Sequence, residues 1–262
     1  MVALAARRDT RLANARRSVL RSHAVAALSS RSTLVTVAER RGGQQRIPRP
    51  PAYRVGGPPP WSGLAPAQRR FTLDDVRARL ADLPPAVDAV ARVGGSRASA
   101  VLVPLFELDG DTHVVFIRRP ETMPTHKGEM AFPGGTFDPG VDPDLRATAL
   151  REAYEEVGLA PAAVDVAAQL DGIGTVASRF TITPFVGFLC ERPTWVPNPR
   201  EVVRVLEVPL SELLDPDVYR EERWDTWKED LDVHFYELAD ETVWGATARI
   251  LTSLLTHLVQ GR

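Results

Sequence analysis

Hydrophobic and polar positions divide the chain after residue 97 into short blocks with either strand or helix periodicity. The first clear block is an apolar run over residues 98–108. The turn Asp109-Gly110-Asp111 follows it, and a second apolar run covers residues 112–118. An aspartate–glycine pair between two apolar runs is a strong signal of a tight β-hairpin. The pattern therefore predicts two antiparallel strands at the start of a sheet.

A helical pattern covers residues 144–157. Its apolar positions recur at helical spacing, which predicts one face packed against a sheet. Gly158 follows, at the position where a helix commonly ends in the left-handed conformation. The apolar positions are Ala147, Leu150, Tyr154 and Val157.

The remaining blocks mix strands and helices without the regular alternation of a doubly wound parallel sheet. We therefore predict an α/β fold with a mixed β-sheet. We interpret the acidic pair Glu221-Glu222 as a solvated surface. Strand patterns lie over residues 164–170, 181–189, 201–208 and 233–238, and helical patterns over residues 71–83 and 243–258.

Composition separates the start of the chain from the rest. Residues 1–70 hold fourteen arginines and no lysine, against two acids, Asp9 and Glu39. Residues 47–66 are rich in proline. We expect residues 1–66 to be a basic, proline-rich, disordered extension and residues 67–262 to be the folded domain. An organelle transit peptide and an arm for nucleic acid or another acidic partner are alternatives for the first 46 residues.

Cysteine content and the length of apolar runs indicate where the protein is located. The one cysteine, Cys190, excludes an intrachain disulfide and a cysteine-based metal site, which favours a reducing, cytoplasmic location. No apolar run is long enough to span a membrane. We expect no membrane partner and no nucleic-acid partner, and a homodimer is an open alternative.

The helix over residues 144–157 carries the clearest chemistry. Glu152, Glu155 and Glu156 stand at positions i, i+3 and i+4, so they share one face of the helix. Like charges this close destabilise a helix unless a cation neutralises them. Carboxylate oxygens are ligands that Mg²⁺ prefers. The cluster therefore predicts a site for Mg²⁺ or Mn²⁺, with Arg151 as an orienting ion-pair partner.

Upstream, Phe132-Pro133-Gly134-Gly135 forms a glycine turn. Glycine lets the backbone approach a metal or phosphate without a Cβ in the way. Arg119 and His126 precede it, the latter beside Lys127, and are candidates for contact with a phosphate. A glycine turn leading into a carboxylate helix suggests hydrolysis of a pyrophosphate.

These residues resemble the Nudix box. Arg151-Glu152-Ala153-Tyr154-Glu155-Glu156-Val157-Gly158-Leu159 matches the second half of the family pattern, with Ala153 at an aliphatic position. The first half departs from it. Measured from Gly135 the loop is two residues longer than in the family, and Pro143 falls where a glutamate is expected. Asp142 or Asp144 takes the place of that glutamate, whose role in the family is to brace the arginine.

The preceding segment is similar to that of Nudix coenzyme A diphosphatases. Arg119, Gly128 and the turn from Phe132 to Gly135 fall in register with that pattern, whereas Pro120 and Pro124 replace a small residue and a second arginine. Residues 243–251 also resemble this subgroup.

The resemblance implies an α/β/α sandwich with the box helix packed on a mixed sheet. It also implies a small-molecule nucleotide as the partner, and cleavage of coenzyme A or acyl-CoA to 3′,5′-ADP and (acyl-)4′-phosphopantetheine. Two alternatives stay open: a Nudix hydrolase acting on ADP-ribose, NADH or another nucleotide, and a non-catalytic binding or regulatory module. The expected metal ligands are Glu152, Glu155, Glu156 and the backbone at Gly135, and the expected substrate contacts are Arg119, His126, Gly128, Phe132, Gly134 and Gly135.

Overall fold

The computed structural model describes residues 41–87, 97–175, 180–225 and 230–260. The chain divides into Met1–Ala38 and Glu39–Arg262, and every described residue belongs to the second unit. A disordered extension, a transit peptide and a binding arm were the three interpretations of the first 46 residues. Residues 1–40 of that segment lie outside the described part. No helix among the described residues is long and apolar enough to cross a membrane.

The main sheet is built around the predicted hairpin. Strands β2 (Arg97–Leu108) and β3 (Asp111–Arg118) pair antiparallel, and Asp109 and Gly110 both adopt positive φ in the turn. Strand β8 (Phe180–Leu189) runs parallel to β2, so the eight-stranded sheet is mixed, as predicted. Its other strands are β4 (Met130–Ala131), β5 (Gly134–Thr136), β6 (Val164–Gln169), β7 (Ile173–Gly174) and β9 (Arg204–Pro209).

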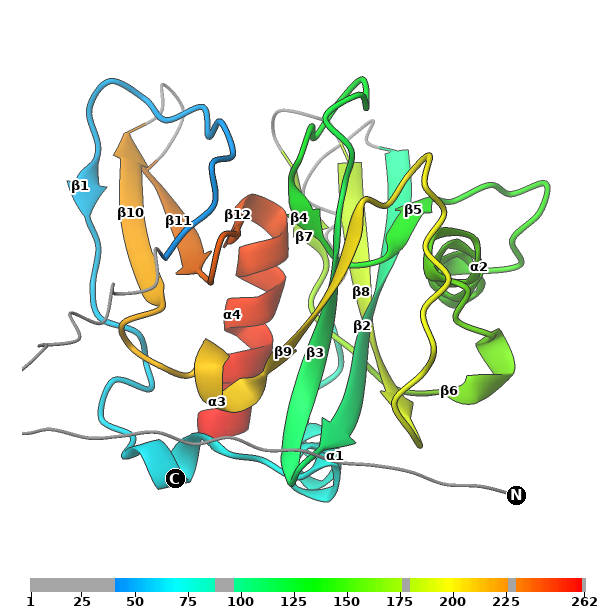
Figure 1. The fold of residues 1–262 in the computed structure, drawn as a ribbon, viewed down its shortest axis with the longest axis horizontal. Coiled ribbons are helices and arrows are strands. Elements are labelled where there is room, and N and C mark those ends of the chain that lie inside the picture. The colour runs from blue at the N-terminus through cyan, green and yellow to red at the C-terminus, as the bar shows by residue number, and fades with distance from the viewer. Residues whose placement is uncertain (1–40, 88–96, 176–179, 226–229, 261–262) are drawn as a thin grey trace, which may run out of the picture. The chain divides into compact units, whose positions relative to one another are not determined.

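Helices cover both faces of this sheet (Figure 1). Side chains of β2 alternate between two apolar clusters, because successive residues of a strand point to opposite faces. Leu102 and Phe106 pack with α2 (Leu145–Val157), whereas Val103 and Leu105 pack with α4 (Gly245–Val259). The fold is therefore the α/β/α sandwich that the resemblance implied. The smaller helices are α1 (Leu73–Leu80), α3 (Leu210–Leu213) and two 3₁₀ turns, Pro66–Arg69 and Pro161–Ala163.

A second, four-stranded sheet packs on the other side of α4. It orders β1 (Arg54–Val55), β10 (Tyr219–Asp225), β11 (Asp230–Glu237) and β12 (Thr242–Trp244), all antiparallel. Glu222 of β10 is 1% exposed, so our interpretation of Glu221-Glu222 as a solvated surface was wrong for Glu222. Arg49 and Arg220 pair with its carboxylate, which makes the burial tolerable.

The expected domain boundary at residue 67 was also wrong, because residues 41–66 pack against the domain. Trp61 is 1% exposed, and its ring lies 5.3 Å from that of Tyr219 and 6.3 Å from that of Tyr236. Strand β1 extends the second sheet through β10. Proline content predicts an extended backbone, but it does not reveal that one tryptophan in the segment enters the core.

We expect Trp61→Ala to lower the free energy of unfolding by about 3–5 kcal/mol, because it removes a large buried ring and leaves a cavity. Urea unfolding monitored by circular dichroism measures this. Val55→Ala in the same segment is the matched control: Val55 is 80% exposed, so we expect a change within about 0.5 kcal/mol. Equal stability of the Trp61→Ala variant and the wild type would show that the segment does not belong to the core.

Candidate active site

Helix α2 places Glu152 and Glu156 beside strand β5 of the main sheet. Asp144 caps its start, accepting a hydrogen bond of 2.7 Å from the N–H of Ala147, and Gly158 ends it with a φ of 71°. The side chains that bury it against β2 are small, Ala149 and Ala153 with Val157. Of the predicted apolar stripe, Val157 is buried and Leu150 packs against the same cluster, as predicted, but the prediction was wrong for Tyr154, which is 57% exposed.

Glu156 lies on the buried side of α2. Its Oε2 accepts a hydrogen bond of 2.9 Å from the N–H of Gly134, and its Oε1 lies 3.6 Å from Nη1 of Arg119. The residue is 1% exposed. Burial raises its pKa to about 8, an effect that the Gly134 hydrogen bond and the Arg119 charge reduce but do not cancel.

Glu152 and Gly135 approach each other closely. A Cβ on Gly135 would lie 2.4 Å from the carboxyl carbon of Glu152, so this position admits no side chain without a shift. Burial raises the pKa of Glu152 as well, and the Arg151 charge opposes that rise. The third glutamate, Glu155, is half-exposed and accepts a hydrogen bond of 3.0 Å from Arg151. The structure thus brings the predicted glutamates and the glycine turn together.

Asp142, rather than Asp144, braces Arg151. Its two carboxylate oxygens accept hydrogen bonds of 2.8 and 3.0 Å from Nε and Nη2 of Arg151. The hydroxyl of Thr148 and the N–H of Asp138 also donate to Asp142. The Arg151 guanidinium, more than any other group, holds the pKa of Asp142 down at about 2. Asp142 therefore takes the place of the glutamate that the box lacks.

The predicted substrate residues divide into two groups. Arg119 lies beside Glu156, and its buried Nε–H has no hydrogen-bond partner among the described residues. Phe132 is 3% exposed and its ring stacks 4.9 Å from Phe116, so it supports the turn from within the core. Gly134 is the donor to Glu156.

The second group, His126 and Gly128, forms the far end of the loop from Arg119 to Glu129. His126 has a φ of 55°, and its Nδ1 lies 2.8 Å from Glu129, which raises the pKa of the imidazole. Gly128 has a φ of 62°, and a Cβ there would meet Glu121 at 2.0 Å. The described contacts of these two residues are within the loop and do not reach the glutamates of α2.

One acid near the site was not identified from the sequence. The charge of Glu201 raises the pKa of both Glu152 and Glu156, so it lies within electrostatic reach of them. Its neighbour Asn198 places it, donating 2.8 Å from its N–H to the carbonyl of Glu156 and also binding the Glu201 carboxylate. Glu201 is 45 residues from Glu156 in the sequence, and no local pattern links the two.

The donor set fits a hard divalent cation. Glu156 is buried and Glu152 is partly buried, and both have raised pKa values, so a nearby positive charge would stabilise their ionised forms. Gly135 leaves the space above Glu152 free of a side chain. In the described part of the chain, however, no three acidic, histidine or cysteine side chains converge as a bound metal requires, and Arg151 pairs with Glu152 and Glu155.

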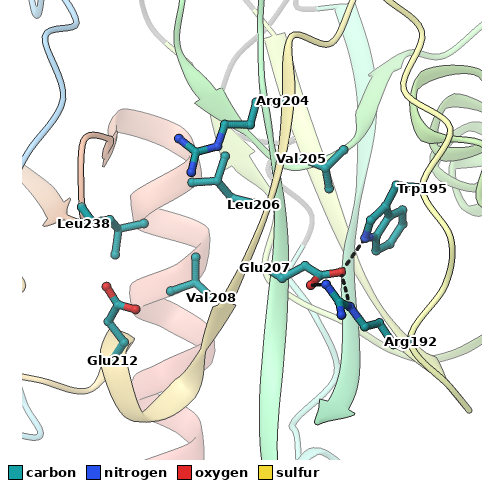
Figure 2. A pocket seen from close by; sticks show the side chains of 10 residues that line it. Arg192, Trp195, Arg204, Val205, Leu206, Glu207, Val208, Glu212 and Leu238 are labelled. Carbon is teal, nitrogen blue, oxygen red and sulfur yellow. Dashed lines mark hydrogen bonds and ion pairs between the residues drawn. The ribbon is translucent and has the colours of Figure 1, made fainter. Parts of the chain in front are cut away.

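A pocket of about 310 Å³ lies elsewhere, along β9 (Figure 2). Within it, Glu207 accepts hydrogen bonds from Arg192 and from the indole of Trp195. None of the glutamates of α2 lines it, and we assign it no part in catalysis.

The chain is similar to known proteins over the region that contains these site residues. The family model of the NUDIX domain matches residues 96–229. The chain is 38% identical over 200 residues to the peroxisomal coenzyme A diphosphatase NUDT7 of Mus musculus, a match that covers 75% of this chain and 82% of that protein. The chain belongs to the Nudix family.

Other relatives extend the comparison. The uncharacterized Nudix hydrolase NudL of Photorhabdus laumondii is 37% identical over 159 residues, which cover 61% of this chain and 83% of that protein. The chloroplastic Nudix hydrolase 22 of Arabidopsis thaliana is 39% identical over 171 residues, 63% of this chain; the match spans only 56% of that relative's length. Among solved structures, a MutT/nudix family protein from Enterococcus faecalis aligns with a TM-score of 0.43 and 14% identity over 72% of this chain and 70% of that chain.

We expect Asp142→Asn to destabilise the protein by about 3 kcal/mol, because it leaves Arg151 without its buried counter-charge. The pKa of Asp142 is about 2 in the folded state, below the ordinary value of 3.8 in the unfolded state. The ionised carboxylate therefore stabilises the fold above about pH 4, and this stability is lost as the pH falls towards 2. The variant should therefore lose less stability than the wild type over that interval in acid unfolding.

Asp144→Asn is the matched control for this pair, because asparagine caps a helix about as well as aspartate. We expect its stability to stay within about 0.5 kcal/mol of the wild type. If Asp144→Asn were the more damaging change, Asp144 would be the brace.

A second prediction concerns the metal-free protein and pH. A folded pKa of about 8 for Glu156, above the ordinary 4.5, means that the folded state retains a proton which the unfolded state has lost. Stability should therefore fall as the pH rises from about 4.5 to 8. Thermal melts in chelator measure this, and Glu156→Gln should flatten the decline. Added Mg²⁺ should stabilise the wild type more at pH 8 than at pH 5; equal stabilisation at both would contradict a carboxylate site.

Proposed function

We propose that the chain is a metal-dependent pyrophosphohydrolase that cleaves coenzyme A or acyl-CoA to 3′,5′-ADP and (acyl-)4′-phosphopantetheine. Family membership supports hydrolysis of a nucleotide-linked pyrophosphate. The match to a coenzyme A diphosphatase over 82% of its length supports the substrate. The site itself contributes its carboxylates at α2, next to an arginine with an unused buried donor.

The reaction adds water across one phosphoanhydride bond. The water oxygen bonds to phosphorus, its proton passes to a carboxylate, and the bridging P–O bond breaks with its electron pair on the departing phosphate. Mg²⁺ or Mn²⁺, when bound, neutralises phosphate charge and makes water easier to deprotonate. Glu152, Glu155, Glu156 and the backbone at Gly135 are the groups that would hold it.

The chain's own residues position the substrate. The buried Nε–H of Arg119 has no hydrogen-bond partner among the described residues, and its guanidinium lies beside Glu156, so this arginine suits a non-bridging phosphate oxygen. Arg151, held by Asp142, keeps Glu152 and Glu155 from separating. Glu201 adds negative charge to the site, which favours a cation in it.

The test is a substrate panel. Purified protein is incubated with Mg²⁺ or Mn²⁺ and with coenzyme A, ADP-ribose, NADH or a dinucleoside polyphosphate, and the products are identified by mass. We expect 3′,5′-ADP and phosphopantetheine from coenzyme A. Preferential cleavage of ADP-ribose would overturn the assignment of coenzyme A as the substrate. ADP-ribose is the first alternative because Pro124 replaces an arginine of the coenzyme A diphosphatase pattern. No cleavage of any compound would leave the non-catalytic module.

Within this proposal we expect Glu152→Gln, Glu155→Gln and Glu156→Gln each to lower kcat/KM by roughly a hundredfold or more. Each removes charge that stabilises the cation, and every 1.4 kcal/mol is a factor of ten. Glu191→Gln, an exposed acid outside the site, is the control and should retain wild-type kcat/KM. A fully active variant at any of the three positions would remove that residue from the metal site.

A further inference from the structure

Two arginines face each other at the end of β3. Arg118 is paired in register with Arg204 of β9, so their side chains lie on the same face of the main sheet. Like charges directly opposite each other destabilise a pair of strands. Glu241 supplies the missing anion, with its Oε1 3.4 Å from Nη1 of Arg118 and 3.7 Å from Nη1 of Arg204.

Glu241 comes from the second sheet, immediately before β12. It is 1% exposed. Its Oε2 accepts a hydrogen bond of 3.0 Å from Gln45, in the segment that precedes the predicted domain boundary. Burial raises the pKa of Glu241, while Arg118 and Arg204 lower it. One buried carboxylate therefore connects the main sheet, the second sheet and the N-terminal segment.

Arg118 is also connected to the loop that follows it. Its Nη2 lies 3.5 Å from Glu121. The Glu121 carboxylate occupies the space where a Cβ on Gly128 would be, so it lies under the far end of the loop. At the base of the loop, the N–H of Arg119 donates to the carbonyl of Glu129 at 3.0 Å. Arg118 thus contacts the loop at its start and, through Glu121, near its end.

We propose that Glu241 is a positioning residue for substrate binding, which acts by holding Arg118 and through it the loop from Arg119 to Glu129. The inference rests on the proposed function, because it assigns Arg119 to the substrate. It makes the second sheet part of the apparatus that binds substrate. The catalytic carboxylates stand on α2, on the other face of the main sheet from α4, so disturbing Glu241 should affect binding more than turnover.

The first experiment needs no substrate. Hydrogen exchange compares the wild type with Glu241→Gln, which keeps the shape of the side chain and removes its charge. We expect the amides of Arg119 and Gly128 to exchange about tenfold faster, the loss of a charged hydrogen bond, while amides of α2 keep their rates. Unchanged exchange in the loop would overturn the proposal.

Glu222→Gln is the matched control. Glu222 is a glutamate equally buried in the second sheet and also paired with two arginines, but it contacts neither Arg118 nor the loop. Its variant should leave exchange in the loop unchanged. Equal acceleration in both variants would mean that general destabilisation of the second sheet, and not the link to Arg118, is responsible.

The second experiment measures kinetics on the compound of the panel that the wild type cleaves best, at saturating Mg²⁺. We expect Glu241→Gln to raise KM about tenfold, equivalent to 1.4 kcal/mol, with kcat within about twofold. In an Arg118→Met background the same change should have little further effect on KM, because the two residues act as a pair. An equal loss of kcat in Glu241→Gln, or additive effects in the double variant, would overturn the positioning role.

These two measurements also separate the proposal from the proposed function. If the wild type cleaves no compound of the panel, the proposed function fails. Faster hydrogen exchange in the loop of Glu241→Gln would then show that the structural link is real while its assignment to substrate binding is wrong. If the wild type cleaves coenzyme A but neither exchange nor KM responds to Glu241, the link fails alone.

Discussion

Helix α2 buries an acidic residue, Glu156, against the main sheet, and the N–H of Gly134 donates the hydrogen bond that this burial requires. A carboxyl group buried without a donor would cost several kcal/mol. The hydrogen bond requires β5 to run beside β2, where Gly134 is in register with Val101. It also places Gly135 against Glu152, so a side chain at that position would require the Glu152 carboxylate to move. One contact therefore fixes the distance between the glycine turn and the glutamates.

The charges of the site are held by residues from several separate segments. Asp142, in the loop before α2, holds Arg151. Glu156 of α2 faces Arg119, which directly follows β3. Glu241 of the second sheet holds Arg118. Because each ion pair joins two segments, charged side chains help to fix the loops around the site, in addition to apolar contacts such as that of Phe132 with Phe116. A polar surface can in this way remain ordered and still be open to a charged substrate.

The parts of this arrangement that were predictable are local in sequence. The Asp109-Gly110 hairpin follows from turn chemistry, and the glutamate cluster of α2 from helical spacing. The choice between Asp142 and Asp144 was not predictable, since both precede the helix; it is decided by which one the backbone places at the N-cap. The burial of Glu222 and of Trp61 depends on residues more than 150 positions away, and no spacing rule reaches that far.

Under the proposed function, substrate choice would depend on the rigidity of the segment from Arg119 to Gly135 as much as on its charge. With Pro124 in place of an arginine, the fully charged side chains left in this segment that could meet phosphate are Arg119 and Lys127. The charge of Arg118 is already balanced by Glu121 and Glu241. A few cations can distinguish one pyrophosphate from another only if their positions are fixed before the substrate arrives, because the free energy of ordering them would otherwise be subtracted from binding. Under the proposed function, the residues that hold the loop in place would therefore contribute to specificity without touching the substrate.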